Sequence, residues 1–356
     1  MRVGVDARML SSSGIGKVIE NILKRMVSQR PEWQFFLIIN RKDCDKFSFL
    51  SLSNVSCIYC NAPIYSIREQ LELWRIIPKN LDVFWSPHYN IPLLYTGKLV
   101  VTVHDLAHLA LRQDKHDFLK KMYARFMMKN VLRKATKIVC VSQFTIDELK
   151  RFFPEADTSK LSLIYNGVDE SWQNIKPGKQ IRNRPYYIFV GNVKPHKNLA
   201  RLIEAYKLVC SEIRQDLVIV GKKDGFINGL NNISELIKGY EDRIVFTGYV
   251  DDDTLKQYVV QSDGMIFPSL YEGFGLPPLE ALMAGIPVIV SNISVMHEVF
   301  KDNVLYFNPI DISDLKNTIK CFSNYTIHKS ISILDRYSWN VVCDKYIEIF
   351  FHMYVK

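Results

Sequence analysis

One segment, residues 269–285, constrains the fold of this chain most, because it reads as the end of a strand, a glycine-rich turn and a short helix. Pro277 and Pro278 fall where a first helical turn leaves its amides unpaired, and a glycine follows where the helix should end. Gly273 and Gly275 let the backbone approach a ligand and place amides at the positive end of the helix. The segment therefore predicts a cradle for a phosphate or another electron-rich oxygen.

Two carboxylates bracket this cradle, Glu272 on the turn and Glu280 inside the helix. Glu272 is expected to face whatever the amides hold, whereas Glu280 can accept two hydrogen bonds from a vicinal diol such as a ribose. The alternative is that Glu280 is a solvated helix carboxylate and that the glycines only form a turn, because short glycine motifs also match by chance.

The whole pattern, two glutamates with Gly-Phe-Gly-Leu-Pro between them, resembles the retaining glycosyltransferases of the GT-B fold, group 4. Further motifs of that family follow in matching order along nearly the whole chain. They are Gly14-Ile15-Gly16, His104-Asp105, Asn166-Gly167-Val168-Asp169 and the stretch from Gly191 to Lys197.

The resemblance implies an α/β fold of the GT-B type, in which two Rossmann-like domains face each other across a cleft. A length of 356 residues also suits two domains. We expect an N-terminal acceptor domain over residues 1–175, a nucleotide-sugar donor domain over 185–335, and a C-terminal helix over 336–356 that returns to the first domain. Residues 173–185 are polar and punctuated by proline and glycine, so the linker is expected there.

Strand-like and helix-like runs alternate in both halves, which indicates two mostly parallel sheets. The expected strands are 2–6, 35–40, 55–60, 83–86, 99–104, 138–142 and 161–165, then 186–191, 217–221, 245–248, 264–268, 287–291 and 304–307. Ligands of such sheets bind beyond the carboxyl ends of the strands. His104 follows the apolar run 99–103 and is therefore expected in the crevice of the first domain.

The resemblance assigns the nucleotide-sugar donor to the second domain. Lys197 stands where the family has a lysine, and we expect it to pair with the diphosphate. Asn192 replaces an arginine of the family, which leaves open whether Lys194, His196 or another group compensates. The donor-binding residues implied in this way are Gly16, Asn192, Lys197, Tyr249 and Val250 at the base pocket, Gly273, Phe274, Gly275, Leu276 and Glu280.

The first domain is expected to present the acceptor. The residues implied for this side are Gly14, Gly16, His104 and Asp105. His104 is expected to hydrogen-bond donor or acceptor hydroxyls. For the loop of Gly14 and Gly16, the alternative is a plain connection between a strand and a helix.

The expected catalytic groups are Glu272, His104 and Lys197. As the bond between sugar and phosphate breaks, prearranged cations and amides stabilise the charge that grows on the diphosphate, so no protein nucleophile is needed. Glu272 is expected to orient the sugar hydroxyls. In the mechanism that the resemblance implies, the leaving phosphate itself takes the acceptor proton.

No metal or other cofactor is expected. Asp251-Asp252-Asp253 contains the D-x-D pattern of another glycosyltransferase fold, but it precedes a helical run and fits a helix cap better. His104 and His108 lack the helical glutamate of a H-E-x-x-H site. Cys57 and Cys60 lie in a strand-like run and point to opposite faces, and the seven scattered cysteines indicate reduced thiols.

The formal net charge is +9, from 46 Lys and Arg against 37 Asp and Glu, which suits an anionic partner. No RNA- or DNA-binding module is recognisable, so we expect no nucleic acid. The stretch from Lys115 to Lys137 reads as a long basic amphipathic helix. Such a helix either rests on an anionic membrane or packs its apolar side on the sheet of the first domain while its lysines face water.

The sequence opens directly into a strand, and no apolar run reaches the roughly 18 residues of a membrane span. A cytoplasmic enzyme is therefore expected, with any membrane contact peripheral and on the inner face of the cytoplasmic membrane.

Together these features predict a metal-independent, retaining glycosyltransferase. The segments 5–8, 14–17 and 194–198 look most like those of mannosyl- and rhamnosyltransferases of bacterial surface polysaccharide assembly. GDP-mannose is therefore the expected donor. The expected acceptor is a saccharide or lipid-linked saccharide of surface polysaccharide or lipopolysaccharide biosynthesis. The alternatives are a nucleotide-sugar epimerase of the same shape and a non-catalytic protein that binds a nucleotide or sugar. The pair of Glu272 and Glu280 favours transfer over epimerisation.

Overall fold

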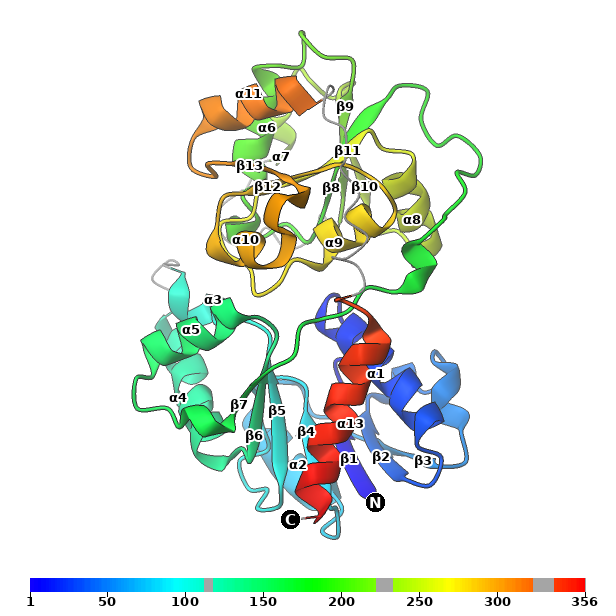
Figure 1. The fold of residues 1–356 in the computed structure, drawn as a ribbon, viewed down its shortest axis with the longest axis vertical. Coiled ribbons are helices and arrows are strands. Elements are labelled where there is room, and N and C mark those ends of the chain that lie inside the picture. The colour runs from blue at the N-terminus through cyan, green and yellow to red at the C-terminus, as the bar shows by residue number, and fades with distance from the viewer. Residues whose placement is uncertain (112–117, 222–232, 323–335, 356) are drawn as a thin grey trace. The chain divides into compact units, whose positions relative to one another are not determined.

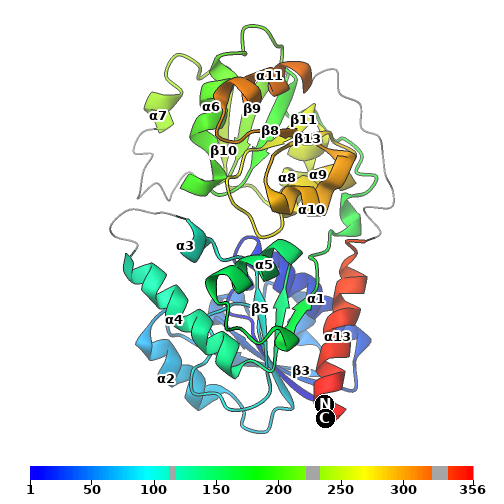
Figure 2. The same ribbon diagram turned by 60° about the vertical axis from the view of Figure 1, so that its left-hand side comes forward.

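The computed structural model describes residues 1–111, 118–221, 233–322 and 336–355. The chain divides into two compact units (Figures 1 and 2). Unit 1 comprises Met1–Gly167 and Arg336–Lys356, and unit 2 comprises Val168–Asp335.

Unit 1 is built on a seven-stranded sheet of order β3-β2-β1-β4-β5-β6-β7, and every pairing in it is parallel. Its strands are β1 (Arg2–Asp6), β2 (Gln34–Ile39), β3 (Val55–Tyr59), β4 (Val83–Ser86), β5 (Leu99–Val103), β6 (Lys137–Cys140) and β7 (Leu161–Leu163). The expected parallel sheet is thus confirmed. β5 ends at Val103, so His104 is the first residue beyond it.

The helices of unit 1 are α1 (Ile15–Gln29), α2 (Ile67–Ile76), α3 (Ala107–Ala110), α4 (Phe118–Lys134), α5 (Gln143–Phe152) and α13 (Trp339–Val355), with short 3-10 turns η1 (Arg41–Asp43), η2 (Ser48–Ser51) and η4 (Thr158–Lys160). Serines at two N-caps explain where helices begin. Ser66 accepts a hydrogen bond from the amide of Glu69 in α2, and Ser142 accepts one from Thr145 in α5.

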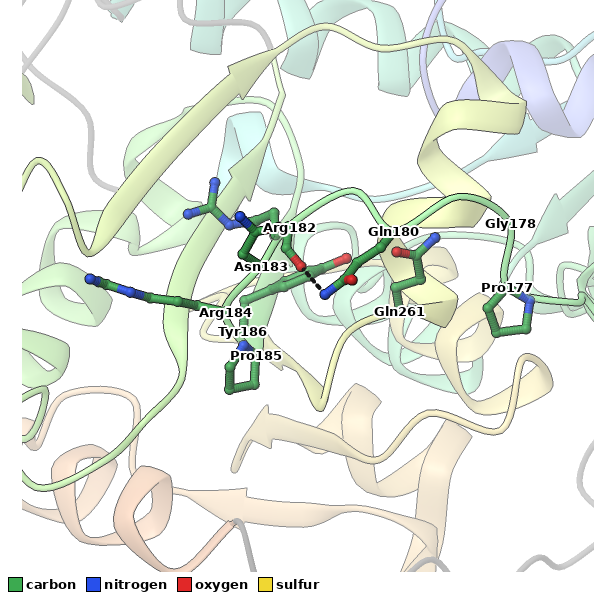
Figure 3. A pocket seen from close by; sticks show the side chains of 9 residues that line it. All are labelled: Pro177, Gly178, Gln180, Arg182, Asn183, Arg184, Pro185, Tyr186 and Gln261. Carbon is green, nitrogen blue, oxygen red and sulfur yellow. Dashed lines mark hydrogen bonds between the residues drawn. The ribbon is translucent and has the colours of Figure 1, made fainter.

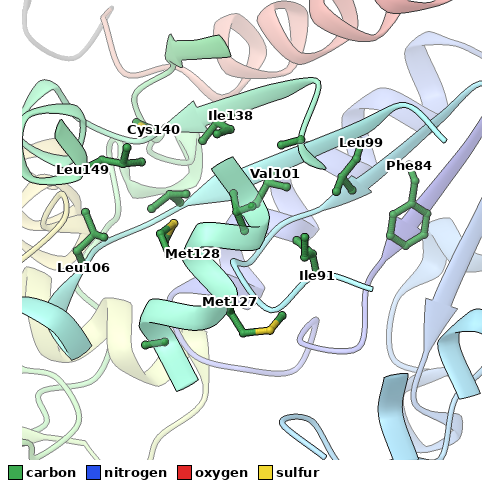
Figure 4. Packing of buried hydrophobic residues seen from close by; sticks show 14 of the residues in the cluster. Phe84, Ile91, Leu99, Val101, Leu106, Met127, Met128, Ile138, Cys140 and Leu149 are labelled. Carbon is green, nitrogen blue, oxygen red and sulfur yellow. The ribbon is translucent and has the colours of Figure 1, made fainter. Parts of the chain in front are cut away.

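The long basic helix expected up to Lys137 ends earlier. α4 stops at Lys134, and Lys137 begins β6, because its backbone pairs with Val100 of β5. Lys115 lies outside the described residues. Met127 and Met128 of α4 are buried in one core cluster with Val101, Ile138 and Leu149 (Figure 4).

The C-terminal helix α13 contacts α1 and β4, which confirms that the end of the chain returns to the first domain. Its Tyr346 hydroxyl lies 2.7 Å from Thr102 Oγ1, which accepts a hydrogen bond of 2.9 Å from Trp85 Nε1. All three side chains are buried. The helix is therefore attached to the sheet by a buried polar chain as well as by apolar packing.

Unit 2 is built on a six-stranded sheet of order β10-β9-β8-β11-β12-β13, again with only parallel pairings among the described strands. Its strands are β8 (Tyr186–Val190), β9 (Asp216–Val220), β10 (Ile244–Gly248), β11 (Gly264–Phe267), β12 (Val288–Ser291) and β13 (Leu305–Phe307). Its helices are α6 (Leu199–Lys207), α7 (Ile233–Leu236), α8 (Asp252–Val260), α9 (Leu276–Met283), α10 (Ser294–Phe300) and α11 (Ile312–Phe322), with 3-10 turns η5 (Glu170–Trp172), η6 (Pro195–Lys197) and η7 (Lys301–Asn303).

The segment expected as a linker, residues 173–185, belongs to unit 2. The amide of Gly178 donates to Gln257 Oε1 at 2.7 Å, and the amide of Ile181 donates to Gln261 Oε1 at 2.9 Å. These bonds fasten the segment along the end of α8.

Each sheet has one place where the strand order reverses. In unit 1 the neighbours at this switch are β1 and β4, and in unit 2 they are β8 and β11. The connections that leave two such strands run to opposite sides of the sheet and open a crevice at their carboxyl ends. The loops after these four strands are therefore the places to look for a ligand site.

We predict that Tyr346→Phe lowers the free energy of unfolding of the protein by about 1–2 kcal/mol, because it leaves buried Thr102 with one hydrogen-bond partner fewer. Urea denaturation followed by circular dichroism measures the change. Tyr354→Phe, on the exposed side of the same helix, is the matched control and should stay within about 0.5 kcal/mol of the wild type. Equal stability of the two variants would contradict the buried link.

Candidate active site

The switch point of unit 2 brings together two expected catalytic residues. Lys197 ends the loop after β8 and Glu272 lies in the loop after β11, and the distance from Lys197 Nζ to Glu272 Oε1 is 2.5 Å. The same ammonium group lies 5.2 Å from the ring centre of Phe267. The two loops are also joined through their backbones, since the Leu270 amide donates to the His196 carbonyl at 2.7 Å.

The glycine turn and helix predicted after Glu272 are present. Gly275 is left-handed, with φ 99°, and immediately precedes α9, whose first turn contains both prolines. A Cβ on Gly275 would lie 3.1 Å from Met296 Cε, so the position has little room as well as an unfavourable φ for other residues. No acidic residue occupies the first turn of α9, so its amide end is electropositive.

Glu280 is only 8% exposed, so it is not the solvated surface carboxylate that was the alternative reading. Most of α9 is buried, and so are Leu279 and Ala281 on either side of Glu280. Phe274 is also buried. A carboxylate kept this far from water requires hydrogen-bond donors.

The remaining donor-side candidates lie at the same edge of the unit 2 sheet. Asn192 follows β8 and is partly buried, whereas Lys194 is exposed. Gly191 and Gly221 allow the ends of β8 and β9 to approach, because a Cβ on Gly221 would lie 2.1 Å from the Gly191 carbonyl oxygen. Tyr249, just after β10, is 74% exposed.

β10 stands at the outer edge of the sheet, two strands from β8, and Val250 follows Tyr249 with a partly buried side chain. An exposed tyrosine at this edge offers a flat face on which a base can stack. The base pocket at Tyr249 and Val250 remains a prediction.

In unit 1, His104 lies partly buried beyond β5. Its Nε2 lies 2.8 Å from the Pro87 carbonyl oxygen, so Nε2 carries a proton and donates it. Burial lowers the pKa of His104 below its usual value, which keeps the ring neutral. Its other nitrogen, Nδ1, then has a lone pair that can accept a hydrogen bond from a hydroxyl.

Asp105 accepts a backbone hydrogen bond at the turn that follows His104. Its Oδ1 accepts a hydrogen bond of 2.9 Å from the Ala107 amide at the start of α3. One oxygen of this carboxylate is therefore engaged in shaping the turn that follows His104.

The two glycines expected near the acceptor differ in their surroundings. Gly14 has φ 59° and caps α1, and a Cβ there would meet nothing within 4 Å. A Cβ on Gly16 would lie 2.4 Å from the Leu10 carbonyl oxygen, so Gly16 allows the start of α1 to pass close to the preceding loop. Part of the reason for glycine at position 16 is thus internal packing.

Sequence analysis missed a buried ionic cluster after β1. Arg8 is 3% exposed and donates to both carboxylate oxygens of Asp6, at 2.7 and 2.6 Å, and its Nη2 also lies 2.6 Å from Glu69 Oε1. These carboxylates raise the pKa of Arg8 against the opposing effect of burial. Asp6 is the last residue of β1 and Arg8 follows that strand, so the rule that located His104 would also have found them.

Two observations bear on metals. Asp251 Oδ1 accepts from the Thr254 amide at 2.8 Å, which confirms that it caps α8, and this bond lowers the pKa of Asp251. Over residues 1–111, 118–221, 233–322 and 336–355, no three His, Cys, Asp or Glu side chains are grouped so that they could hold a metal ion.

A surface hollow of unit 2 lies elsewhere (Figure 3). Its lining residues are Pro177, Gly178, Gln180, Arg182, Asn183, Arg184, Pro185, Tyr186 and Gln261. Tyr186 is the first residue of β8, so the hollow is at the amino end of the strand, whereas Lys197 and Glu272 follow carboxyl ends. Arg182 is already paired with Asp216 at 3.0 Å. The hollow therefore does not belong to the candidate active site.

Comparison with known families matches both halves of the chain. The description "Glycosyltransferase Family 4" matches residues 12–172, and "Glycosyl transferases group 1" matches residues 171–327. A curated relative, the O-antigen chain mannosyltransferase RfbU of Salmonella typhimurium, is 31% identical over 69% of this chain and 69% of its own length. The chain belongs to glycosyltransferase family 4.

This glycosyltransferase has further relatives among proteins of O-antigen synthesis. The O-antigen chain mannosyltransferase B of Escherichia coli is 30% identical over 69% of this chain and 66% of its own length. The O-antigen biosynthesis glycosyltransferase WclY of Escherichia coli is 24% identical over 99% of both chains. As a family 4 enzyme, the protein is a retaining, metal-independent hexosyltransferase that uses a nucleotide-sugar donor.

Solved structures show the same fold. Sucrose-phosphate synthase from Thermosynechococcus elongatus aligns with a TM-score of 0.78 and 16% identity over 100% of this chain and 99% of its own. Anabaena HepE, solved in complex with UDP-glucose, aligns with a TM-score of 0.77 and 17% identity over 98% and 99%. The GT-B fold of this glycosyltransferase is thereby established. In the described part of the chain, no helix is both long and apolar enough to cross a membrane.

We predict that Gly16→Ala destabilises the glycosyltransferase by about 2–3 kcal/mol, because the new methyl group collides with the Leu10 carbonyl whether or not a ligand is bound. Gly178→Ala, where the added Cβ meets only the flexible end of Gln257, should change stability by about 0.5 kcal/mol or less. Thermal unfolding without ligand tests both. A Gly16→Ala protein as stable as the wild type would leave ligand contact as the reason for this glycine.

Proposed function

We propose that the protein transfers mannose from GDP-mannose, with retention of configuration, to a saccharide or lipid-linked saccharide in surface polysaccharide or lipopolysaccharide assembly. The observation that carries the proposal is the meeting of Lys197, Glu272 and the glycine turn before α9 at one strand switch. The choice of mannose is supported by the relatives at about 30% identity, which are named as mannosyltransferases.

In the proposed reaction, charge grows on the diphosphate as the glycosidic bond breaks. Lys197 supplies a fixed positive charge there, and the amides that begin α9 supply further donors. The 2.5 Å contact with Glu272 holds the ammonium group in place before the donor arrives. Glu272 then orients the sugar hydroxyls, and Glu280 accepts hydrogen bonds from the ribose. The leaving phosphate takes the acceptor proton.

On the acceptor side, His104 is proposed to accept a hydrogen bond from a sugar hydroxyl through Nδ1. Its proton on Nε2 is held by the Pro87 carbonyl, which fixes both the ring orientation and the tautomer.

Glu280→Ala should weaken GDP binding more than tenfold, because a carboxylate that accepts from a diol contributes about 1.5–3 kcal/mol per charged hydrogen bond. Isothermal calorimetry with GDP measures the affinity, and Glu241→Ala, an exposed acid of unit 2, is the control that should bind GDP as the wild type does. Unchanged GDP affinity in folded Glu280→Ala would remove the ribose role.

The same purified protein tests the donor. A nucleotide present at one hundred times its dissociation constant stabilises a protein by about 2.7 kcal/mol, which thermal unfolding detects. We expect GDP and GDP-mannose to raise the midpoint more than UDP, dTDP and their sugars do. Stabilisation by UDP or dTDP compounds alone would overturn the choice of GDP-mannose.

We further propose that unit 1 contacts an anionic membrane through α4. The helix has no acidic residue between Phe118 and Lys134. Five basic residues of the helix are exposed, Lys120, Lys121, Arg125, Lys129 and Arg133, and so are four apolar ones, Phe118, Leu119, Met122 and Phe126. The core takes up other residues of the helix, including Met127 and Met128 (Figure 4), so core packing accounts for only part of its apolar surface.

Helix α2 adds a second exposed apolar row, formed by Ile67, Leu71 and Trp74. Asn90 links the two helices, because its side-chain Nδ2 donates to Glu69 of α2 and its side-chain Oδ1 accepts from the Tyr123 hydroxyl of α4. Exposed apolar side chains among surface cations are the combination that binds the boundary of an anionic bilayer. A lipid-linked acceptor would be presented at such a surface.

Sedimentation with liposomes that contain phosphatidylglycerol or cardiolipin tests this contact. We expect the wild type to co-sediment at low salt and the joint change of Lys120, Lys121, Arg125 and Lys129 to glutamate to abolish it, because each surface cation contributes about 1 kcal/mol. The matched control reverses four exposed lysines elsewhere, Lys42, Lys150, Lys176 and Lys345. If both variants lose binding equally, net charge and not α4 explains it, and the proposal fails.

A further inference from the structure

A group of aromatic rings lies beside His104 in unit 1 and has no assigned role. The ring centres of Tyr65 are 5.9 Å from those of both His88 and Tyr123. His88 is 4.2 Å from Tyr89, which in turn is 6.2 Å from His108. We call these five residues the aromatic wall.

The wall shares the strand switch of unit 1 with His104. His88 and Tyr89 follow β4, and the residue before them, Pro87, provides the carbonyl that holds His104. Burial raises the pKa of Tyr89, and the charge of Asp105, next to His104, is close enough to raise it further. The wall and the expected acceptor residues therefore form one surface at the carboxyl ends of β4 and β5.

Tyr65 is held in this surface against its backbone preference. Its φ is 70°, in the left-handed region that a bulky residue rarely adopts. Its amide donates to Glu69 Oε2 at 2.7 Å, and Glu69 is completely buried and anchored by Arg8 and Asn90. The ring is nevertheless 48% exposed. Strained residues that are fixed by a buried network and still face solvent concentrate at ligand sites.

The hydrogen bonds of the wall fix its polar atoms. The backbone amide of Asn90 donates to His88 Nδ1 at 3.2 Å, so His88 carries its proton on Nε2. This Nε2 lies 3.4 Å from the Tyr65 hydroxyl. Burial, aided by His104, lowers the pKa of His88 to about 3, so this ring is neutral at physiological pH. The wall thus combines the half-exposed Tyr65 with neutral hydroxyl and imidazole groups.

The charges beneath the wall select against an anionic ligand. Asp6 and Glu69 share a single guanidinium, that of Arg8, so the cluster has one negative charge in excess. Asp105 adds another carboxylate nearby. A phosphate would be repelled here, whereas a neutral sugar ring presents C–H groups to an aromatic face and hydroxyls to its edge.

We propose that the aromatic wall binds a neutral pyranose ring of the acceptor and that Tyr65 is its specificity-determining residue. The ring of Tyr65 packs against one face of the sugar, and His88 and Tyr89 border the adjoining hydroxyls. This inference rests on the proposed function, because it takes unit 1 to be the acceptor side. It adds the chemical class of the ligand, an uncharged sugar, and the residues that contact it.

Saturation-transfer NMR with methyl α-D-mannopyranoside, glucopyranoside and galactopyranoside at millimolar concentration tests the proposal without knowledge of the natural acceptor. We expect the wild type to transfer saturation to at least one of these glycosides, most strongly to C–H protons of one face. Tyr65→Gly should reduce the signal at least fivefold, whereas Tyr65→Phe, which keeps the ring, should stay within twofold of the wild type. Tyr354→Ala, which removes an exposed tyrosine from α13, should leave it unchanged.

Tyr65→Gly also separates recognition from folding, because glycine adopts φ 70° without strain, and circular dichroism should show the wild-type fold. The inference is overturned if no glycoside receives saturation from the wild type, if Tyr65→Gly binds as the wild type does, or if Tyr65→Phe loses as much as Tyr65→Gly. GDP affinity should be the same in all variants. Failure of the wild type to bind any nucleotide would instead contradict the proposed function, whatever the glycosides show.

Discussion

The parallel pairing of β8 with β11 is the constraint on which the donor side depends. β8 and β11 are neighbours, and the connections that follow them run to opposite sides of the sheet. The loops after the two strands therefore begin side by side, and Lys197 lies 2.5 Å from Glu272 although 75 residues separate them. Both side chains are mostly shielded from water, so each charge needs the other until a substrate supplies new partners. In the proposed reaction, this ion pair holds the Lys197 cation in place for the phosphate, and Glu272 balances its charge until the donor binds.

The switch point of unit 1 is arranged for different chemistry. In its buried cluster, Arg8 pairs with both Asp6 and Glu69. Glu69 also accepts a hydrogen bond from the Tyr65 amide and so fixes the loop that carries Tyr65. His104 and His88 are kept neutral by burial. Neutral imidazoles and phenols on a rigid base suit a sugar, whereas the ammonium group and helix amides of unit 2 suit a diphosphate. The proposed roles of the two units, acceptor binding in unit 1 and donor binding in unit 2, rest on this difference in chemistry.

Helix α4 contributes residues to the core, to the aromatic wall and to the outer surface of unit 1. Its Met127 and Met128 fill the core below, its Tyr123 belongs to the aromatic wall, and its Phe118 and Phe126 face outward. Core packing occupies one face of this helix, and the proposed membrane contact would involve the other. A change on its outer face therefore tests membrane contact without emptying the core.

The sequence by itself determined the local features. Pro277, Pro278 and Gly275 dictate a turn and a helix start, Asp251 caps the helix that follows it, and alternating strands and helices require parallel sheets. Such features depend on backbone preferences and on neighbours within a few residues, so they can be read directly. The resemblance to family 4 also rests on short motifs, such as the segment from Glu272 to Glu280, so it is visible in the sequence alone.

Only the tertiary structure decided which distant residues meet and how far each is buried. The burial of Glu280, the collision that requires Gly16, the role of Glu69 beneath Tyr65 and the end of α4 at Lys134 all depend on strands and loops far away in the chain. The physical reason is that burial and pairing are set by the order of strands in the sheet. Strand order is a property of the whole folded unit, and no local pattern of residues specifies it.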